Sequence, residues 1–427
     1  MAHKAMVAKI TEVIEIPGAD KIHVAKVLGE NVVVSKDWGV GFVGILFPVD
    51  VQLSHEMAHH NNLYRESSQN ADTQRTGFFE GSRRVRAQPF LKVKSEGFFT
   101  DFNALAFTGV NLIDLKIGDS FDELNGVKLC QKYFNEKTLA LKDAKPKAKK
   151  LNTTPFFDKH VDSEQFKHYA HMIRPGSLLS FHAKVHGTSA RMAHTKVAIQ
   201  LKPWQEFVNR FVPVFPTEKW DYVVGTRNVV INDGSKTGFH GSEQFRFDVL
   251  DMVKPYLEKG MSIYGEIAGY ANGTPIMSKH NVAALKDKAF TKKYGKDDMV
   301  YNYGCKEHEF RFHIYRITYL NHEGQNIDFT QAQIDKWCHD RGLLGPLEVH
   351  PQMVYNGDVR TLQDLVSDLT ERPELLTEDY IDPSHVSEGI IVRVDNGKMT
   401  PQFYKSKSYA FRVMEGLCQA EDVEDAS

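Results

Sequence analysis

The chain has 427 residues, of which 41% are hydrophobic and 25% are charged, a composition that can bury cores and excludes a fibrous or disordered protein. Lysine and arginine number 53 and aspartate and glutamate 55, so a polyanionic partner would have to be met by a local cationic patch. No apolar run approaches the roughly 20 residues of a membrane-spanning helix, and the first ten residues lack the apolar core of a secretion signal. The four cysteines form no C-x-x-C pair, which argues against structural zinc and disulfides. We expect a soluble, cytoplasmic protein of two domains with no membrane partner.

The first region, residues 1–135, alternates short β-branched runs with turn signals such as "PGAD" and "GEN". This pattern is typical of a small antiparallel barrel with little helix. Within it, "GSRRVRAQPFLKVKSEGFF" interleaves cations with apolar and aromatic residues, as a surface that contacts phosphates and bases does. The candidate nucleic-acid-binding residues are Arg83, Arg84, Arg86, Lys92 and Lys94. A solvated strand face is the alternative, because short basic runs are common.

The same region contains "HEMAH", residues 55–59, which matches the H-E-x-x-H pattern of zinc proteases. That chemistry needs two histidines one helical turn apart and a third ligand, and no third ligand stands out downstream. The flanking residues predict a strand end that runs into a long polar loop rather than a core helix. We therefore interpret the match as a coincidence.

A lysine-rich stretch with two nearby prolines, "LKDAKPKAKKLNTTP", predicts a linker over residues 136–160. After it, "FDKHVDSEQFKHY", residues 157–169, has helical spacing, and the chain then becomes rich in strands again. Two further helices are predicted. Trp204, Phe207 and Phe211, at i, i+3 and i+7, indicate a helix face packed in the core, and "YNGDVRTLQDLVSDLTERPELL" indicates an amphipathic helix that covers one side of the core.

The chemistry begins at "SFHAKVHGTSARM", where Lys184 stands between a strand-like run and a glycine-containing turn. A lysine can attack phosphorus when its surroundings keep the amine neutral, although a surface lysine at a strand end is the more common case. The interpretation therefore depends on partners, and these follow in order: Arg227, Glu266, Glu388, Lys405 and Lys407. Lys405 and Lys407 share one face of a predicted strand and would neutralise phosphates, while Glu388 would hold a divalent metal directly or through water.

In chain order, "KVHG", "GTRN", "YGEIAG", "IYRI", "EGIIVR" and "YKSK" resemble the motifs of the covalent nucleotidyltransferases, and among these the ATP-dependent RNA ligases. The resemblance implies an α+β fold whose antiparallel-sheet nucleotidyltransferase domain spans residues 161–420, followed by an acidic tail at 421–427. Residues 1–135 are similar to the amino-terminal OB-type domain of a nick-sealing subgroup, which implies an OB-like β-barrel that binds nucleic acid.

The resemblance also implies a three-step reaction. A lysine attacks the α-phosphate of ATP, AMP passes to an RNA 5′-phosphate, and a 3′-hydroxyl displaces AMP. Lys184 would be the nucleophile, Glu266 would hold the ribose, Tyr315 would stack on adenine, Glu388 would bind Mg²⁺ or Mn²⁺, Lys405 and Lys407 would contact phosphate, and Arg227 would position the nucleotide or the 5′-phosphate. The expected partner is RNA with 3′-hydroxyl and 5′-phosphate ends in a nicked duplex, bound by a monomer.

The sequence departs from the family pattern at three places. His186 stands where many relatives place an aspartate; a neutral imidazole cannot supply that negative charge near metal-bound water, so Glu388 would carry more of it while His186 forms a hydrogen bond there. His182 and Ala183 precede the lysine where threonine and glutamate are frequent, and Arg316 stands where an acidic residue is common. These departures leave the adenine contacts open.

Three other functions stay open. A DNA ligase or an mRNA-capping guanylyltransferase would usually carry an OB domain after the core, and few residues follow Lys407, which favours an RNA ligase. An inactive ligase core that serves as an RNA-binding module is a further alternative. It would be expected to have lost Lys184 or one of the two late lysines first, and these are present.

Overall fold

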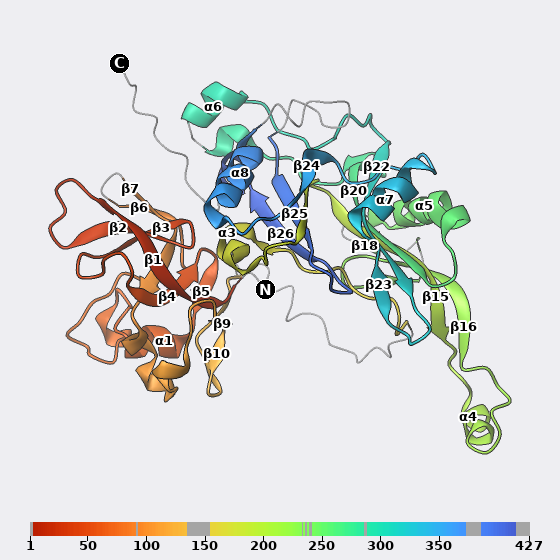
Figure 1. Ribbon diagram of the computed structural model, residues 1–427, viewed down its shortest axis with the longest axis horizontal. Coiled ribbons are helices and arrows are strands. Elements are labelled where there is room, and N and C mark those ends of the chain that lie inside the picture. The colour runs from red at the N-terminus through yellow and green to blue at the C-terminus, as the bar shows by residue number, and fades with distance from the viewer. Residues whose placement is uncertain are drawn as a thin grey trace. The chain divides into compact units, whose positions relative to one another are not determined.

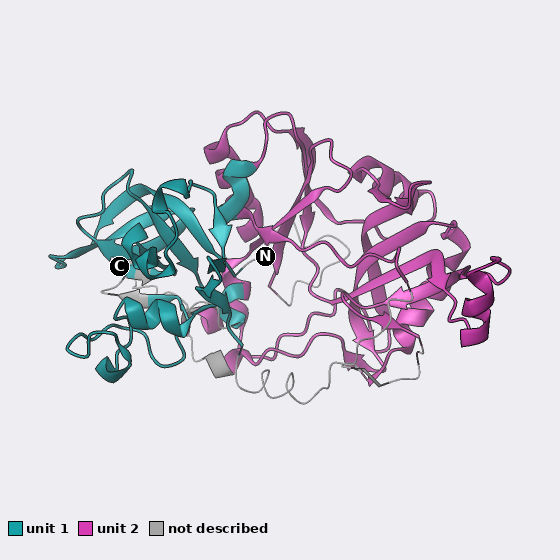
Figure 2. Ribbon diagram, turned by 90° about the horizontal axis from the view of Figure 1, so that it is seen from below, with its two compact units in different colours: residues 1–147, 167–172, 412–427 teal, residues 148–166, 173–411 magenta. Residues whose placement is uncertain are grey.

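A computed structural model describes residues 3–90, 93–134, 154–232, 234, 237–238, 241–285, 288–372 and 386–415. The chain divides into two compact units (Figure 2), with unit 1 formed by residues 1–147, 167–172 and 412–427, and unit 2 by residues 148–166 and 173–411. Of the expected linker, residues 136–153 lie outside the described part. No helix in the described part of the chain is long and apolar enough to cross a membrane.

The main sheet of unit 1 is a nearly closed, barrel-like sheet. Its strands are β1 (Ala5–Glu15), β2 (Ile22–Val27), β3 (Glu30–Ser35), β4 (Val43–Pro48), β8 (Gly97–Thr100) and β9 (Ser120–Phe121). They are ordered β3-β2-β1-β4-β8, and β9 pairs with β1. A backbone hydrogen bond of 2.6 Å from Glu96 N to Asn31 O joins the region before β8 to β3, which brings the two ends of the sheet together. The predicted small antiparallel barrel is confirmed at this level.

Strand β1 shows why this sheet forms, because its alternate residues enter two different cores. Ala5 and Val7 pack in one cluster with Ile45, while Met6 and Ile10 pack in another with Val32, Leu46 and Phe99. A strand that is buried on both faces reads as a continuous apolar run, as "AMVA" does. The smaller strands of unit 1 are β5 (Val51–Leu53), β6 (Gln88–Phe90), β7 (Val93–Ser95), β10 (Glu123–Leu124), β11 (Val127–Lys128) and β12 (Cys130–Lys132), and its 3₁₀ turns are η1 (Ser67–Gln69), η2 (Phe102–Thr108) and η3 (Leu112–Asp114).

The "HEMAH" stretch forms a short helix, α1 (His55–His60). The predicted strand end and polar loop flank it, but the prediction that no helix lies between them is wrong. Ser54 caps the helix by accepting a hydrogen bond from the backbone of Met57, and the apolar residues between the histidines are buried. The histidine rings contact neighbouring residues: His55 Nδ1 lies 2.8 Å from the Tyr64 hydroxyl, and His59 Nδ1 lies 2.8 Å from the Gln69 carbonyl oxygen. No cluster of three or more potential metal ligands occurs in the described part of the chain.

A buried glutamate joins a later segment to the barrel of unit 1. Of the helix predicted over residues 157–169, only its last turn, α3 (Phe166–Tyr169), is helical; a 3₁₀ turn, η4 (Ala170–Met172), follows. Lys167 Nζ forms an ion pair with the carboxylate of Glu30, and His168 Nε2 lies 3.1 Å from it. Burial alone would raise the pKa of Glu30, but the charge of Lys167 and the hydrogen bond with His168 lower it to about 2.

Unit 2 contains two antiparallel-rich sheets. The first is ordered β13-β26-β25-β14-β24 and the second β17-β16-β15-β20-β22-β23, with β21 paired to β20. Their strands are β13 (Glu164–Gln165), β14 (Leu178–Ala183), β24 (Glu348–Val354), β25 (Gly389–Asp395) and β26 (Gln402–Lys407), and β15 (Thr188–Ala198), β16 (Glu218–Gly225), β17 (Val230–Ile231), β20 (Met261–Ala271), β21 (Thr274–Pro275), β22 (Phe310–Leu320) and β23 (Asn326–Asp328). Two short strands, β18 (Thr237–Gly238) and β19 (Gly241–Ser242), pair separately. The expected α+β class is confirmed.

Helices cover these sheets. The helices α5 (Gln244–Val253) and α7 (Gln331–His339) contribute Val249 and Ile334 to the core that β15, β20 and β22 form. The predicted amphipathic helix is confirmed as α8 (Val359–Glu371), whose buried face includes Leu362 and Val366. The remaining helical segments are η5 (Lys254–Tyr256), η6 (Val282–Leu285), α6 (Lys288–Tyr294) and α9 (Tyr409–Met414).

The prediction of a packed aromatic helix face at Trp204 is wrong. Trp204 and Phe207 belong to α4 (Pro203–Asn209), and Phe211 follows it. The helix α4 lies at the far end of the β15–β16 hairpin, beyond the other strands of the sheet (Figure 1). Trp204, Phe207 and Phe211 are 55%, 60% and 74% exposed. Helical spacing shows that three side chains share a face, but it does not show whether another part of the chain covers that face.

Candidate active site

Lys184 lies in the turn between β14 and β15, and glycine allows this turn to approach the next sheet. The Lys184 backbone N–H donates to Gly389 O at 2.8 Å, which ties the turn to β25. A Cβ on Gly187 would lie 2.3 Å from Ile267 O and 3.0 Å from Glu266 Cγ. Any side chain at 187 would therefore push β20 away, so the glycine of "KVHG" allows Lys184 and Glu266 to line one pocket.

The carboxylate of Glu388 lies close to two lysines and a histidine of the site. Its Oε1 lies 2.9 Å from Lys184 Nζ and 3.6 Å from Lys407 Nζ, and its Oε2 lies 3.3 Å from His186 Nδ1. Glu388 is only 4% exposed, and burial alone would raise its pKa. The charge of Lys184, the hydrogen bond with His186 and the charge of Lys407 instead lower the pKa of Glu388 to about 2. The carboxylate is therefore ionised at neutral pH.

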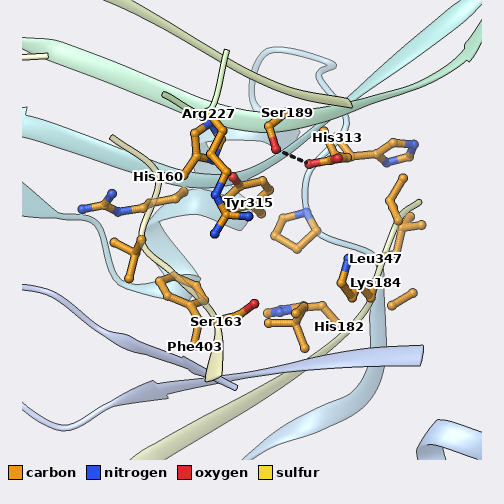
Figure 3. A pocket seen from close by; sticks show the side chains of 17 residues that line it. His160, Ser163, His182, Lys184, Ser189, Arg227, His313, Tyr315, Leu347 and Phe403 are labelled. Carbon is orange, nitrogen blue, oxygen red and sulfur yellow. Dashed lines mark hydrogen bonds between the residues drawn. The ribbon is translucent and has the colours of Figure 1, made fainter. Parts of the chain in front are cut away.

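The structure places Lys184 in the wall of a pocket of about 190 Å³ that lies within unit 2. Figure 3 shows Lys184 and Leu347 on one side of it and Arg227 and His160 on the other. The pocket is lined by His160, Val161, Ser163, His182, Ala183, Lys184, Val185, Ser189, Arg227, Glu266, His313, Tyr315, Arg316, Pro346, Leu347, Ile391 and Phe403. Segments that are distant in the sequence thus meet around one space.

A row of three polar side chains crosses the wall of this pocket. Glu266 on β20 pairs in register with Ser189 on β15 and with His313 on β22, so all three point to one face. Ser189 Oγ donates to Glu266 Oε2 at 3.1 Å, the bond drawn in Figure 3. Burial raises the pKa of Glu266 to about 7 and outweighs the lowering by the charge of Lys184; the charge of Glu388 adds a smaller rise. This carboxyl therefore exchanges its proton near neutral pH.

Aromatic and apolar side chains form another part of the wall. The Tyr315 hydroxyl is hydrogen-bonded to His160 Nδ1, and Ile391, Leu347 and Phe403 complete an apolar surface. Burial, with the nearby charge of Arg191, lowers the pKa of His160 to about 3. The ring of His160 is therefore neutral, with one donor and one acceptor nitrogen, and its Nδ1 shares a hydrogen bond with the Tyr315 hydroxyl.

The cations of the site come from two places. Arg227, in the turn after β16, pairs with Asp162. Lys405 and Lys407 lie two residues apart on β26, as predicted, in register with Ile391 and Gly389 of β25. Burial and the charges of Lys407, Lys184 and Arg227 lower the pKa of Lys405 to about 8, which indicates that positive charge is concentrated here.

The positions that depart from the family pattern are buried. Arg316 forms a two-point ion pair with Asp328, with Nε 2.5 Å from Oδ1 and Nη2 2.8 Å from Oδ2. The acidic residue at this place in the structure is therefore Asp328 on β23, and position 316 supplies its cationic partner. His182 is 8% exposed, and burial, with the charge of Arg393, lowers its pKa to about 3.

The cationic residues predicted to bind nucleic acid belong to unit 1, whereas the residues that line the pocket belong to unit 2. Arg83 donates to the Leu53 and Gly81 carbonyls and to a tyrosine hydroxyl. Arg84 pairs with Asp50, and Arg86 lies 4.0 Å from Glu80. Lys92 and the side chain of Lys94 are outside the described part of the structure. Binding of nucleic acid by this set stays a prediction.

Sequence reasoning missed several pocket residues. His160 and Ser163 were assigned to a linker and a helix, and the structure places both in the pocket wall, on a segment without regular secondary structure. His313 could have been found, because it lies two residues before Tyr315 in "FHIYRI" and a strand places such residues on one face. Nothing in the local sequence around His160 pointed to the site.

No protein-family model and no curated protein sequence matches this chain. Among solved structures, it is similar to a Naegleria gruberi RNA ligase mutant in its apo form, with a TM-score of 0.58 and 15% identity over 97% of this chain and 99% of the other. It is also similar to a mutant of that ligase with ATP and Mn (TM-score 0.56, 14% identity, 98% and 99% covered) and to one with AMP and Mn (0.55, 15%, 96% and 98%). At this identity the similarity shows a shared fold over nearly the whole length of both chains.

Proposed function

We propose that the protein is an ATP-dependent RNA ligase, an enzyme that joins a 3′-hydroxyl and a 5′-phosphate end of RNA in a phosphodiester bond. The observation that carries the proposal is the position of Lys184. It lies in a pocket wall 2.9 Å from an ionised, buried glutamate, with Glu266 in the same wall and Lys407 on the same glutamate. The fold is that of a ligase solved with ATP, AMP and Mn, which supports this chemistry.

In the first step, the Lys184 Nζ lone pair forms a bond to the α-phosphorus of ATP, and the bond to pyrophosphate breaks. The amine loses a proton as it attacks. AMP then passes to an RNA 5′-phosphate as the P–N bond breaks, which gives a 5′-adenylylated end. Finally, a 3′-hydroxyl oxygen attacks the RNA phosphorus and AMP leaves. Such phosphoryl transfers need positioning and positive charge more than a strong base.

The pocket, together with Lys405 and Lys407 on the neighbouring strand β26, offers a matching surface for each part of the nucleotide. Tyr315 and Ile391 provide apolar area for the adenine base. Glu266 provides a carboxyl group for the ribose hydroxyls. Lys405 and Lys407 provide charge for the phosphates, and Arg227 supplies a guanidinium for the nucleotide or the RNA 5′-phosphate.

Glu388 is the residue that would hold a divalent cation, Mg²⁺ or Mn²⁺. The described residues contain no cluster of three metal ligands, which fits a cation that is bound by one carboxylate together with substrate phosphates and water. When bound, the cation would stabilise the charge on the leaving pyrophosphate and compete with Lys184 for Glu388. His186, 3.3 Å from the same carboxylate, would orient it.

Unit 1 would be an OB-like domain that grips RNA beside a nick. The strand order β3-β2-β1-β4-β8 and the hydrogen bond between its ends support an OB-type barrel. Arg86, Lys92 and Lys94 are the cations to test first, since Arg83 and Arg84 form close hydrogen bonds within the unit, whereas Arg86 lies 4.0 Å from Glu80. Replacing these three by glutamate should weaken binding of a nicked duplex while labelling of Lys184 by ATP is unchanged.

The deciding experiment is incubation with α-labelled ATP and Mg²⁺, followed by a denaturing gel. We expect label on the wild-type chain with ATP and little with GTP, and none on Lys184→Ala. Lys196→Ala is the matched control, because this partly exposed lysine lies on the adjoining strand, pairs with Glu218 and does not line the pocket. Labelled protein supplied with nicked RNA should then give a sealed product. Sedimentation should show that the active protein is a monomer.

The opposite result has a definite meaning. If the wild type takes no label with either nucleotide and either metal but still binds RNA, the ligase proposal is wrong and the chain is an RNA-binding module. Labelling by GTP in preference to ATP would point to a capping-type guanylyltransferase instead.

A further inference from the structure

His313 has an unusual environment for a buried polar side chain. It is 2% exposed, and neither Nδ1 nor Nε2 has a hydrogen-bond partner within the described part of the chain. Among the described residues of the pocket wall, it alone has two ring nitrogens without partners. Buried polar groups are nearly always satisfied, so an orphaned ring that lines a cavity indicates that a ligand supplies the missing bonds.

The place of His313 in the sheet limits which part of a nucleotide it can meet. It lies directly across from Glu266 and two residues from Tyr315 on the same strand face. The apolar wall that suits a base is on the Tyr315 side, and the cations that suit phosphates are Lys184, Lys405 and Lys407. His313 therefore lies beside the carboxyl group, between the two ends of the nucleotide.

The chemistry of the ring selects the ligand group further. Burial and the charge of Arg311 lower the pKa of His313 to about 4, so the ring is neutral, with one donor and one acceptor nitrogen. A phosphate oxygen only accepts and would leave the acceptor nitrogen unsatisfied. A sugar hydroxyl both donates and accepts, and two adjacent hydroxyls can bridge Glu266 and His313.

We propose that His313 is a specificity-determining residue that hydrogen-bonds a ribose hydroxyl of the nucleotide and so selects ribonucleotides over deoxynucleotides. This inference rests on the proposed function, since it concerns the nucleotide whose α-phosphate meets Lys184. Sites built to bind a hydroxyl reject analogues without it strongly, because their own polar groups are then left unpaired.

The test compares labelling of Lys184 by ATP, 2′-deoxyATP and 3′-deoxyATP, each carrying the α-label. In the wild type we expect kcat/KM for at least one deoxynucleotide to be about 10- to 100-fold below that for ATP. In His313→Leu the ratio should fall below about 3-fold, chiefly through a higher KM for ATP. His313→Gln keeps a donor and an acceptor and should retain part of the preference. His322→Leu, in an exposed turn, is the control and should match the wild type.

Each ratio is measured within one protein, so partial unfolding of a variant cancels. The inference is overturned if His313→Leu keeps the wild-type preference for ribose, or if it loses discrimination between ATP and ITP while sugar discrimination is intact, which would place His313 at the base. If the wild type is labelled by no nucleotide, the proposed function fails and this inference fails with it.

Discussion

Two buried glutamates, one in each unit, have nearly the same partners and very different settings. Glu30 in unit 1 meets Lys167 and His168, and Glu388 in unit 2 meets Lys184 and His186. Charge lowers the pKa of each carboxyl to about 2 against the effect of burial. An identical list of residue types therefore does not identify an active site.

The surroundings of the lysine make the difference. Lys184 lines a pocket that also contains Glu266 and Arg227, and Lys407 adds a second cation to its glutamate. Lys167, in contrast, lies on the turn of α3 that ties residues 167–172 to the barrel of unit 1. We interpret the first cluster as chemical and the second as structural, and the following predictions test that distinction.

The largest expected effect is on activity at Lys184. Lys184→Met should lower labelling by ATP at least 1000-fold, equivalent to about 4 kcal/mol of transition-state free energy, because Lys184 is the only lysine among the described residues that line the pocket. Its melting temperature should stay close to that of the wild type. Activity above a tenth of the wild type would show that another residue is the nucleophile.

The matched change in unit 1 should act on stability instead. Glu30→Gln removes a buried charge that holds Lys167 and His168, and we expect the free energy of unfolding to fall by roughly 3 kcal/mol in urea titrations. Labelling of Lys184, measured per folded molecule, should be unchanged. Glu12→Gln, which breaks an exposed pair with Lys26, is the control and should cost no more than about 0.5 kcal/mol.

The lowered pKa of Glu30 predicts that the stability of the protein depends on pH. The pKa of Glu30 is about 2 in the folded chain, below its ordinary value of 4.5, so the unfolded chain binds more protons between these values. Its contribution should be fully present above about pH 4.5 and be lost as the pH falls towards 2. The stability difference between the wild type and Glu30→Gln, followed from pH 6 to pH 3, should shrink; a constant difference would contradict the structural interpretation.

The smallest effect is expected at the exposed aromatic helix. Trp204→Ser, Phe207→Ser and Phe211→Ser should each change the free energy of unfolding by no more than about 0.5 kcal/mol, because these side chains are exposed. Leu362→Ala on α8, where the side chain is buried, should cost about 2–4 kcal/mol. Comparable losses at both helices would mean that α4 is covered in the folded protein.

The sequence alone determined the order and residue types of the motifs proposed to be catalytic, the barrel-like first region and the amphipathic helix α8. These features follow from local patterns: a strand alternates every two residues, a helix every 3.6, and a nucleophile with its cations must come in defined types. The pairing of Lys405 with Lys407 on β26 needed only the strand period.

The tertiary structure alone decided which residues share the pocket and which faces are covered. His160 contacts Tyr315 because an irregular segment brings it there, and His313 lies beside Glu266 because of the strand register. Likewise, α4 is exposed although its spacing is that of a packed helix, and Glu30 is buried with partners on α3. Contacts between segments that are distant in the sequence depend on how the whole chain folds, and the local spacing of residue types does not determine that.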